Sequence, residues 1–307
     1  MTVRTALREG AEFLAGLGVP GARLDVEVLL CRVLGCGREK LYVAFESILG
    51  AGAMKQFHSL LRRRAQREPI SYITGHREFW SLDFDVTPQV LVPRPETELL
   101  VEVTLGILAK KGSPARILEI GTGSGAISVS LATERTDAEI WATDLSGSAL
   151  EVARINARRH KVEKQIHFLQ GDLFAPLGKR GFGFFGLVVS NPPYVPSAEI
   201  ERLAREIHHW EPRLALDGGA DGLDCYRRIL GEAHRYLTEP GFLVLEIGAE
   251  SGAQVSPLVE ATGRFRAPAI HRDYCGRERV VVAQKAPFDA MYGRRNLIPS
   301  EAKTQRG

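Results

Sequence analysis

The sequence has few cysteines, and only Cys31 and Cys36 lie close together, which limits the kinds of site it can build. Only four occur among 307 residues, at positions 31, 36, 225 and 275, and no Cys-x-x-Cys pair is present. Disulfide frameworks and zinc clusters need more cysteines at closer spacing. The histidines, including His208 and His209, also lack the spacing of metal ligands. We therefore expect free thiols in a reducing compartment and no bound metal.

Long apolar runs and a strong charge of one sign are missing too. No apolar stretch approaches the ~20 residues that a transmembrane helix needs. The first residues carry Glu9 and Glu12 within an amphipathic pattern, unlike a signal peptide. A formal net charge of +3 is too small to indicate a nucleic-acid-binding protein. We expect a cytoplasmic protein and a monomer, with no membrane contact and no stable binding to nucleic acid.

Residues 1–75 repeat apolar side chains at helical spacing, which predicts a small helical bundle. Up to residue 70 the chain has 11 Lys and Arg against 7 Asp and Glu. Four of these arginines form a cluster: Arg62, Arg63, Arg64 and Arg67. Such a cluster is either a solvated helix face or a docking surface for an acidic or RNA-containing partner.

The pattern changes at residues 76–93, where alternating apolar residues predict a β-hairpin linker. Residues 94–286 begin with a helical stretch and then alternate strand and helix patterns. Alternation of this kind predicts a mostly parallel sheet, here of seven strands, with helices on both faces. Residues 287–307 show no period, and we expect a mobile tail. The expected strands are 115–121, 138–144, 166–172, 185–194, 242–248, 265–273 and 278–285.

Glycines and carboxylates follow the first three of these strands, where a doubly wound sheet binds its ligand. The first strand ends in Glu119-Ile120-Gly121-Thr122-Gly123-Ser124-Gly125, whose glycines allow a tight turn close to a ligand. Asp144 ends the second strand and could accept hydrogen bonds from both ribose hydroxyls. Asp172 after the third could bind an adenine amino group while Leu173 packs on the ring.

This pattern predicts a nucleotide-type ligand without choosing between NAD and S-adenosylmethionine (SAM). The segment Gly121-x-Gly123-x-x-Ala126 also satisfies the loose dinucleotide fingerprint. Glu119 has two interpretations, either holding the ammonium group of a bound methionine moiety or serving as a hydrogen-bonded structural carboxylate.

The fourth strand ends in an unusual corner, Ser190-Asn191-Pro192-Pro193-Tyr194. Proline fixes φ and lacks a donor, and a residue before proline is forced towards extended geometry. The corner is therefore rigid and rich in acceptors, namely the Asn191 side-chain oxygen and the Pro192 carbonyl, with Tyr194 as a flat wall. Two acceptors can hold the two N–H bonds of a planar amino group and aim its nitrogen at a methyl donor. A dinucleotide oxidoreductase has no use for such a corner, which favours SAM.

Asn-Pro-Pro-Tyr after the fourth strand is typical of SAM-dependent methyltransferases that act on amino groups. The chain as a whole resembles one family of them, the peptide chain release factor glutamine methyltransferases of the PrmC/HemK type. The resemblance extends to about residue 285. Besides the corner, it rests on the helical N-terminal region and three further segments: Gly75-His76-Arg77-Glu78-Phe79-Trp80, Leu91-Val92-Pro93-Arg94-Pro95-Glu96-Thr97-Glu98 and Leu214-Ala215-Leu216-Asp217-Gly218-Gly219-Ala220-Asp221-Gly222-Leu223.

The resemblance implies a class I, Rossmann-like SAM methyltransferase fold and transfer of methyl to N5 of the glutamine in the Gly-Gly-Gln motif of bacterial-type release factors, leaving S-adenosyl-L-homocysteine. Because the cofactor motifs begin only after residue 90, while residues 1–75 are helical and mildly basic, we expect residues 1–75 to recognise the protein acceptor. Asn191, Pro192, Pro193 and Tyr194 would grip the glutamine. SAM would be bound by Gly121, Thr122, Gly123, Ser124, Gly125, Asp144, Asp172 and Leu173, and we expect Glu119 and Asn191 to contribute to cofactor binding as well.

Two alternatives stay open at this point. One is a SAM-dependent N6-adenine methyltransferase acting on nucleic acid, which would use the same corner. Against it, the charge is modest and no separate sequence-reading domain is recognisable. The other is a catalytically silent binding module. An intact glycine turn, ribose carboxylate and corner argue against loss of activity.

Overall fold

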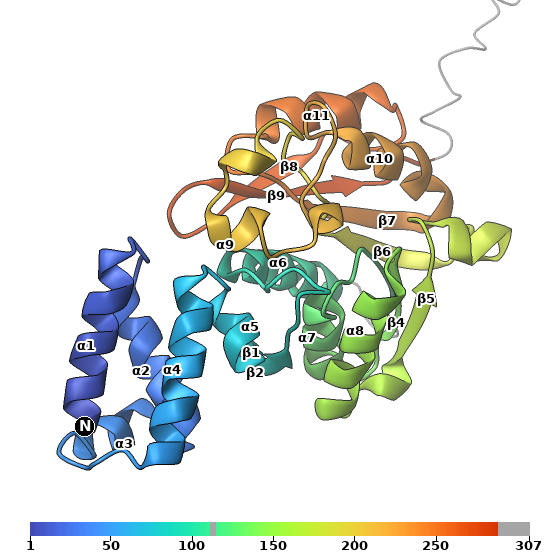
Figure 1. The fold of residues 1–307 in the computed structure, drawn as a ribbon. Coiled ribbons are helices and arrows are strands. Elements are labelled where there is room, and N and C mark those ends of the chain that lie inside the picture. The colour runs from blue at the N-terminus through green and yellow to red at the C-terminus, as the bar shows by residue number, and fades with distance from the viewer. Residues whose placement is uncertain (111–114, 288–307) are drawn as a thin grey trace, which may run out of the picture.

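The computed structural model describes residues 1–110 and 115–287. The chain begins with helices, which pack around a shared apolar core (Figure 1). Side chains such as Val26, Leu30 and Phe57 are fully buried there. Thr2 caps the first helix, since its hydroxyl accepts the Thr5 N–H at 3.2 Å. The helical N-terminal region expected from the sequence is confirmed. Its helices are α1 (Val3–Gly16), α2 (Ala22–Leu34), α3 (Arg38–Val43), α4 (Ala51–Ala65) and α5 (Ile70–Thr74).

A short hairpin follows, in which β1 (His76–Phe79) pairs antiparallel with β2 (Leu82–Asp85). Phe79 and Phe84, 1% and 0% exposed, pack into the apolar core of the sheet region that comes next. The hairpin is therefore part of that core and is shorter than the predicted 76–93. Beyond it, residues 86–93 run without strand structure, and Val90 packs against α8 (Gly147–Arg159).

A seven-stranded sheet forms the centre of the rest, as the sequence predicts. Its strand order is β5-β4-β3-β6-β7-β9-β8, and only β9 runs antiparallel to its neighbours. The predicted tail falls almost wholly on residues 288–307, outside the described residues.

The strands are β3 (Arg116–Ile120), β4 (Glu139–Asp144), β5 (Ile166–Gln170), β6 (Phe185–Ser190), β7 (Leu237–Glu246), β8 (Ala269–Arg272) and β9 (Glu278–Gln284). The remaining α-helices are α6 (Glu98–Ala109), α7 (Ala126–Glu134), α9 (Arg205–His208), α10 (Asp224–Tyr236) and α11 (Gly252–Ala261). Short 3-10 helices are η1 (Pro95–Thr97), η2 (Glu163–Gln165), η3 (Ala175–Gly181), η4 (Ile200–Arg202) and η5 (Arg213–Ala215).

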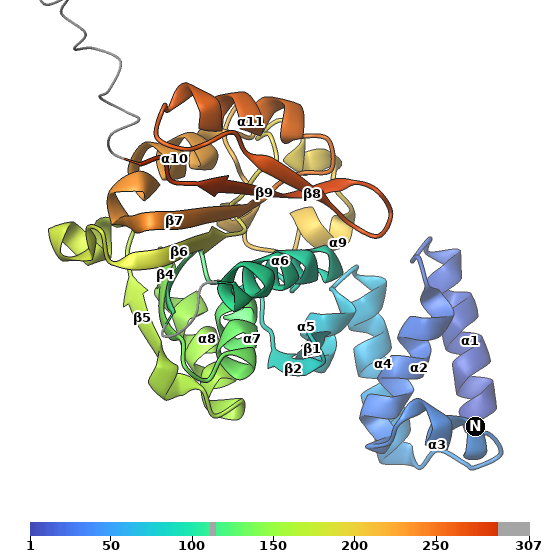
Figure 2. The same ribbon diagram turned by 180° about the vertical axis from the view of Figure 1, so that it is seen from behind.

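Helices cover both faces of this sheet, as Figures 1 and 2 show from opposite sides. Successive residues of a strand point to opposite faces. Thus Ile117 of β3 packs with α6 and α7, while Leu118 packs with α10 and α11. Strands buried on both sides explain the nearly continuous apolar runs in the sequence. The carboxyl ends of β3, β4, β5 and β6 lie at the same end of the sheet, because these strands run parallel.

A buried ion cluster joins the helical region to the sheet region. Arg64, 5% exposed, pairs with Asp25 at 2.6 Å and with Glu206 of α9 at 3.1 Å. Arg67 reaches the same Glu206 oxygen at 2.9 Å, and Arg63 pairs with Glu68. The solvated helix face weighed from the sequence is therefore wrong for Arg64. Three of the four clustered arginines bind carboxylates within the chain.

Candidate active site

The turn after β3 is shaped by glycines that adopt left-handed backbone geometry. Gly121 and Gly123 have φ of 73° and 55°, and a Cβ on either would project into open space. L residues with side chains rarely adopt this region. Gly125 has a second constraint, because its Cβ would lie 3.1 Å from that of Ala153 in α8. The turn therefore offers bare backbone to the space above it and packs closely on the helix behind.

Asp144 lies at the carboxyl end of β4, beside this turn. Its Oδ2 accepts the N–H of Gly123 at 2.8 Å, and its Oδ1 accepts the N–H of Ser146 at 2.9 Å. Burial raises the pKa of Asp144, and these backbone hydrogen bonds oppose the rise. A carboxylate oxygen can accept a second hydrogen bond, so both oxygens retain capacity for a ligand. The residue is held in place and still available to a ligand.

Glu119 lies behind the turn, fully buried. Its Oε2 accepts the Thr122 hydroxyl at 2.7 Å and the Ser128 N–H at 3.1 Å, which fixes the turn to the start of α7. Burial raises the pKa of Glu119 to about 7. These contacts favour the structural interpretation of Glu119; contact with the methionine moiety stays a prediction.

The turn after β5 brings Asp172 and Leu173 to the same edge. Asp172 Oδ2 accepts a hydrogen bond from Arg228 Nη2 of α10 at 2.5 Å. Leu173 has φ of 47°, unusual for a residue with a side chain, and packs partly on the apolar cluster beneath α10. Arg228 was not singled out from the sequence, because it lies 56 positions from Asp172.

The proline corner leaves β6 at this edge as well. Ser190 donates a hydrogen bond to the Ile120 carbonyl at 2.7 Å, which anchors the corner to β3. The Asn191 side-chain nitrogen Nδ2 donates to Thr97 Oγ1 at 3.2 Å. Tyr194 packs partly into the apolar cluster of α10 and α11, and burial raises its pKa to about 12. Tyr194, expected to be a flat wall of the site, therefore packs behind the corner and does not line the cavity.

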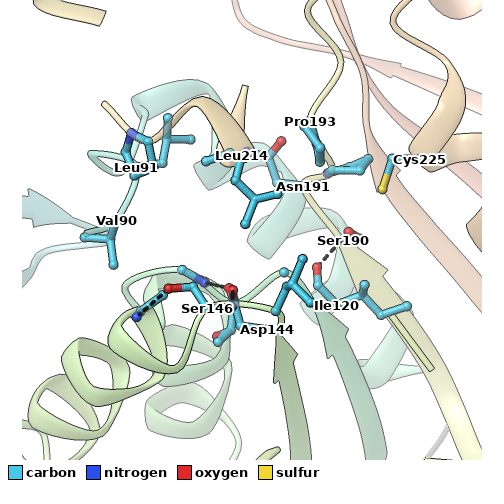
Figure 3. A pocket seen from close by; sticks show the side chains of 18 of the residues that line it. Val90, Leu91, Ile120, Asp144, Ser146, Ser190, Asn191, Pro193, Leu214 and Cys225 are labelled. Atoms are coloured by element: carbon cyan, nitrogen blue, oxygen red, sulfur yellow. Dashed lines mark hydrogen bonds between the residues drawn. The ribbon is translucent and has the colours of Figure 1, made fainter. Parts of the chain in front are cut away.

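These elements surround one cavity of about 600 Å³, a usual size for a small-molecule site. Asp144 and Ser146 lie on one side of it, and Asn191, Pro193 and Leu214 lie on the other (Figure 3). Of the residues named from the sequence, the lining includes Gly121, Thr122, Gly123, Ser124, Asp144, Asp172, Leu173, Asn191, Pro192 and Pro193. The other three, Glu119, Gly125 and Tyr194, lie behind it.

Two further segments line the cavity without having been assigned a role from the sequence. They span residues 88–97 and 212–228 and overlap the segments 91–98 and 214–223 quoted above for the family resemblance, which was the signal available for finding the overlapping parts. Arg94 belongs to the first, and its Nη2 donates to Glu211 Oε1 at 2.7 Å. Burial raises the pKa of Glu211, and Arg94 opposes the rise. This pair ties the segment of Arg94 to the residue just before the second segment.

The residues present fit SAM. Bare backbone at Gly121 and Gly123 leaves room for a ligand, and Asp144 can accept from ribose hydroxyls. Residues 1–110 and 115–287 hold no group of three or more His, Cys, Asp or Glu side chains arranged for a metal ion. Over those same ranges, no helix is both long and apolar enough to cross a membrane.

The sheet order, with the site at the carboxyl ends of its strands, defines a class I, Rossmann-like methyltransferase fold. Solved structures share it. A methyltransferase from Pyrococcus furiosus aligns with a TM-score of 0.51 at 19% identity, covering 74% of this chain and 99% of that one. The catalytic domain of hMettl16 aligns with a TM-score of 0.55 at 15% identity, covering 73% and 82%.

Sequence comparisons narrow the class to one family. Residues 5–75 match the family described as the PrmC N-terminal domain, and residues 96–219 match the methyltransferase small domain, which implies use of SAM. The release factor glutamine methyltransferase of Moorella thermoacetica is 45% identical over 285 residues, 93% of this chain and 99% of the relative. That of Geobacter sulfurreducens is 42% identical over 262 residues, 85% and 89%. This chain belongs to the release factor glutamine methyltransferase family.

Proposed function

We propose that this protein transfers a methyl group from SAM to the side-chain nitrogen N5 of a glutamine in a peptide chain release factor. The observation that carries the proposal is that the Asn191–Pro192 corner and the Asp144 carboxylate line one cavity of about 600 Å³. One side offers what a nucleoside needs, and the other offers acceptors for a planar amino group. Family membership gives the substrate class, with the glutamine of the Gly-Gly-Gln motif as the expected target.

On the cofactor side, Asp144 would accept the ribose hydroxyls, and the glycine turn would offer bare backbone for close approach. Asp172 and Leu173 would hold the adenine, and Arg228 donates a hydrogen bond to the Asp172 carboxylate. SAM supplies a methyl group on a sulfonium that is already activated, so neither a metal nor a strong base is required. S-adenosyl-L-homocysteine is the product.

On the acceptor side, the Asn191–Pro192 corner would orient the glutamine amide nitrogen, which is a poor nucleophile. The lone pair of an amide nitrogen is delocalised into its carbonyl, so orientation has to supply much of the rate. Asn191 Oδ1 accepts one N–H of the glutamine amide, and the Pro192 carbonyl accepts the other. The nitrogen is thereby aimed at the methyl carbon. As the N–C bond forms, the nitrogen loses one proton to solvent.

The acceptor protein would be recognised outside this cavity, by residues 1–75. Their fixed placement through Arg64, Arg67 and Glu206 supports this, since Glu206 lies in the segment that follows the corner. A release factor bound to the helical region would meet the cavity mouth at a set distance.

One assay tests the proposal directly. Purified protein is incubated with methyl-labelled SAM and, separately, with intact release factor or duplex DNA. Label on a glutamine side chain of the release factor is the expected result. Label on adenine of DNA, with none on the release factor, would support the nucleic-acid alternative and overturn the proposal.

A further inference from the structure

A buried carboxylate lies directly behind the acceptor corner and has no part in the proposed chemistry. Glu246 ends β7, next to β6 in the sheet, where Ser190 pairs with Leu245. Asn191, directly after β6, and Glu246, the last residue of β7, are therefore the next residues along at the ends of two adjacent strands. Glu246 is 1% exposed, and its Oε2 lacks a hydrogen-bond partner within residues 1–110 and 115–287. A buried carboxylate is expensive to keep, so its neighbours matter.

The nearest of these neighbours are Thr97 and Asn191, which both line the cavity. Burial raises the pKa of Glu246 to about 7, and hydrogen bonds from Thr97 and Asn191 oppose the rise. Asn191 Nδ2 also donates to Thr97 Oγ1 at 3.2 Å. Thr97 is 5% exposed and lies in η1, within the segment that enters α6. The charged or titratable groups that also face Glu246 are Glu96, Tyr194, Tyr226 and Arg279.

Which group donates and which accepts in these hydrogen bonds follows from the chemistry of the side chains. An ionised carboxylate can only accept, whereas a threonine hydroxyl has one proton to donate. Thr97 therefore gives its proton to Glu246, which leaves its oxygen free to accept from Asn191. The NH2 end of the Asn191 amide must then face Thr97 and Glu246. Its oxygen is left facing the cavity.

Resting on the function proposed above, we propose that Thr97 and Glu246 are positioning residues that hold the Asn191 carboxamide with its oxygen towards the acceptor nitrogen. The two ends of an amide are nearly identical in shape and differ only in hydrogen bonding. A flipped Asn191 would present N–H groups to the N–H groups of the glutamine amide. The hydrogen-bond relay Asn191–Thr97–Glu246 excludes that arrangement wherever Glu246 is ionised, so the glutamine amide then meets a hydrogen-bond acceptor.

The test compares Thr97→Val, which keeps the shape and removes the hydroxyl, with Thr97→Ser, which keeps the hydroxyl. Glu246→Gln removes the acceptor-only character of the carboxylate, and Glu260→Gln, at an exposed position of α11, is its matched control. Methylation of release factor is followed at a pH above the pKa of Glu246. We expect kcat to fall roughly tenfold or more in Thr97→Val and Glu246→Gln, with SAM affinity and KM nearly unchanged. Thr97→Ser should recover most of the loss.

A second readout needs no acceptor protein. The chain has three asparagines, Asn156, Asn191 and Asn296, so ¹⁵N-asparagine labelling gives three side-chain NH2 signals. Asn191→Ala identifies the signal of Asn191. That signal should be protected from hydrogen exchange in the wild type and in Thr97→Ser, and should lose protection in Thr97→Val.

The outcomes separate the relay from the proposed function. Wild-type kcat in Thr97→Val with unchanged protection would overturn the relay, as would equal losses in the valine and serine variants. A wild-type protein that shows the protection pattern but does not methylate release factor would leave the relay standing and overturn the proposed function.

Discussion

The backbone N–H of Gly123 donates a hydrogen bond to Asp144 Oδ2 at 2.8 Å, so the turn after β3 is built on the carboxylate at the end of β4. The two features that the sequence offers for cofactor binding are therefore one structural unit. A change at Asp144 acts on a ligand directly and also through the turn.

Asp144→Ala should weaken SAM binding by tens-fold or more, because charge-assisted hydrogen bonds contribute ~1.5–3 kcal/mol each. The Gly123 and Ser146 N–H groups also lose their partner, so stability should fall as well. Asp144→Asn keeps one acceptor oxygen and should lose less of both. Calorimetric titration with SAM measures the first effect, and urea unfolding measures the second. Wild-type SAM affinity in Asp144→Ala would place the ribose elsewhere.

The buried Glu119 makes a prediction about stability and pH. Its pKa is about 7 in the folded protein against a usual value of 4.5. Between these values the folded state holds a proton that the unfolded state has released, so the free energy of unfolding falls as pH rises through this window. Glu119→Gln removes this titration and should make the profile less steep, while Glu246, whose pKa burial also raises to about 7, keeps its own contribution. Urea unfolding on both sides of the window, with Glu260→Gln as control, measures it. A variant as pH-dependent as wild type would contradict a buried, titrating Glu119.

The ion cluster predicts different effects for neighbouring arginines. Arg64→Met leaves Asp25 buried without its partner and should cost about 3 kcal/mol, in the range for breaking a buried ion pair. Arg62→Met on the exposed face of the same helix should change stability by less than ~0.5 kcal/mol. The measurement is the urea midpoint of each variant. Equal, small effects would mean that the cluster does not stabilise the contact between the helical region and α9.

Much of this fold follows from local patterns. Strands buried on both faces produce continuous apolar runs, and glycines or acids at their ends mark the ligand edge, so Gly121, Asp144 and Asn191 could be placed from the sequence. Placing these residues requires only the order of the strands along the chain and the position at which each strand ends.

What the sequence could not show depends on contacts between distant residues. Trp80 and Ser81 turn the hairpin at φ of 54° and 55° without glycine, and the Trp80 N–H is held by Glu98 Oε1 at 2.8 Å. Arg64 meets Glu206 142 positions away. Thr97 and Glu246 flank Asn191 only because η1 and β7 converge on the corner. Local composition carries no signal for such pairings.

The most direct test of the account is single-turnover methyl transfer to release factor by Asn191→Ala at saturating SAM. The substitution removes one of two anchors for the amide and leaves the proline corner, so folding and SAM affinity should change little. Preorganised hydrogen bonds at a reacting centre contribute ~3–4 kcal/mol, so the rate should fall by roughly 10²–10³-fold. A rate close to that of the wild type would mean that the corner does not orient the acceptor nitrogen, and would contradict the mechanism proposed here.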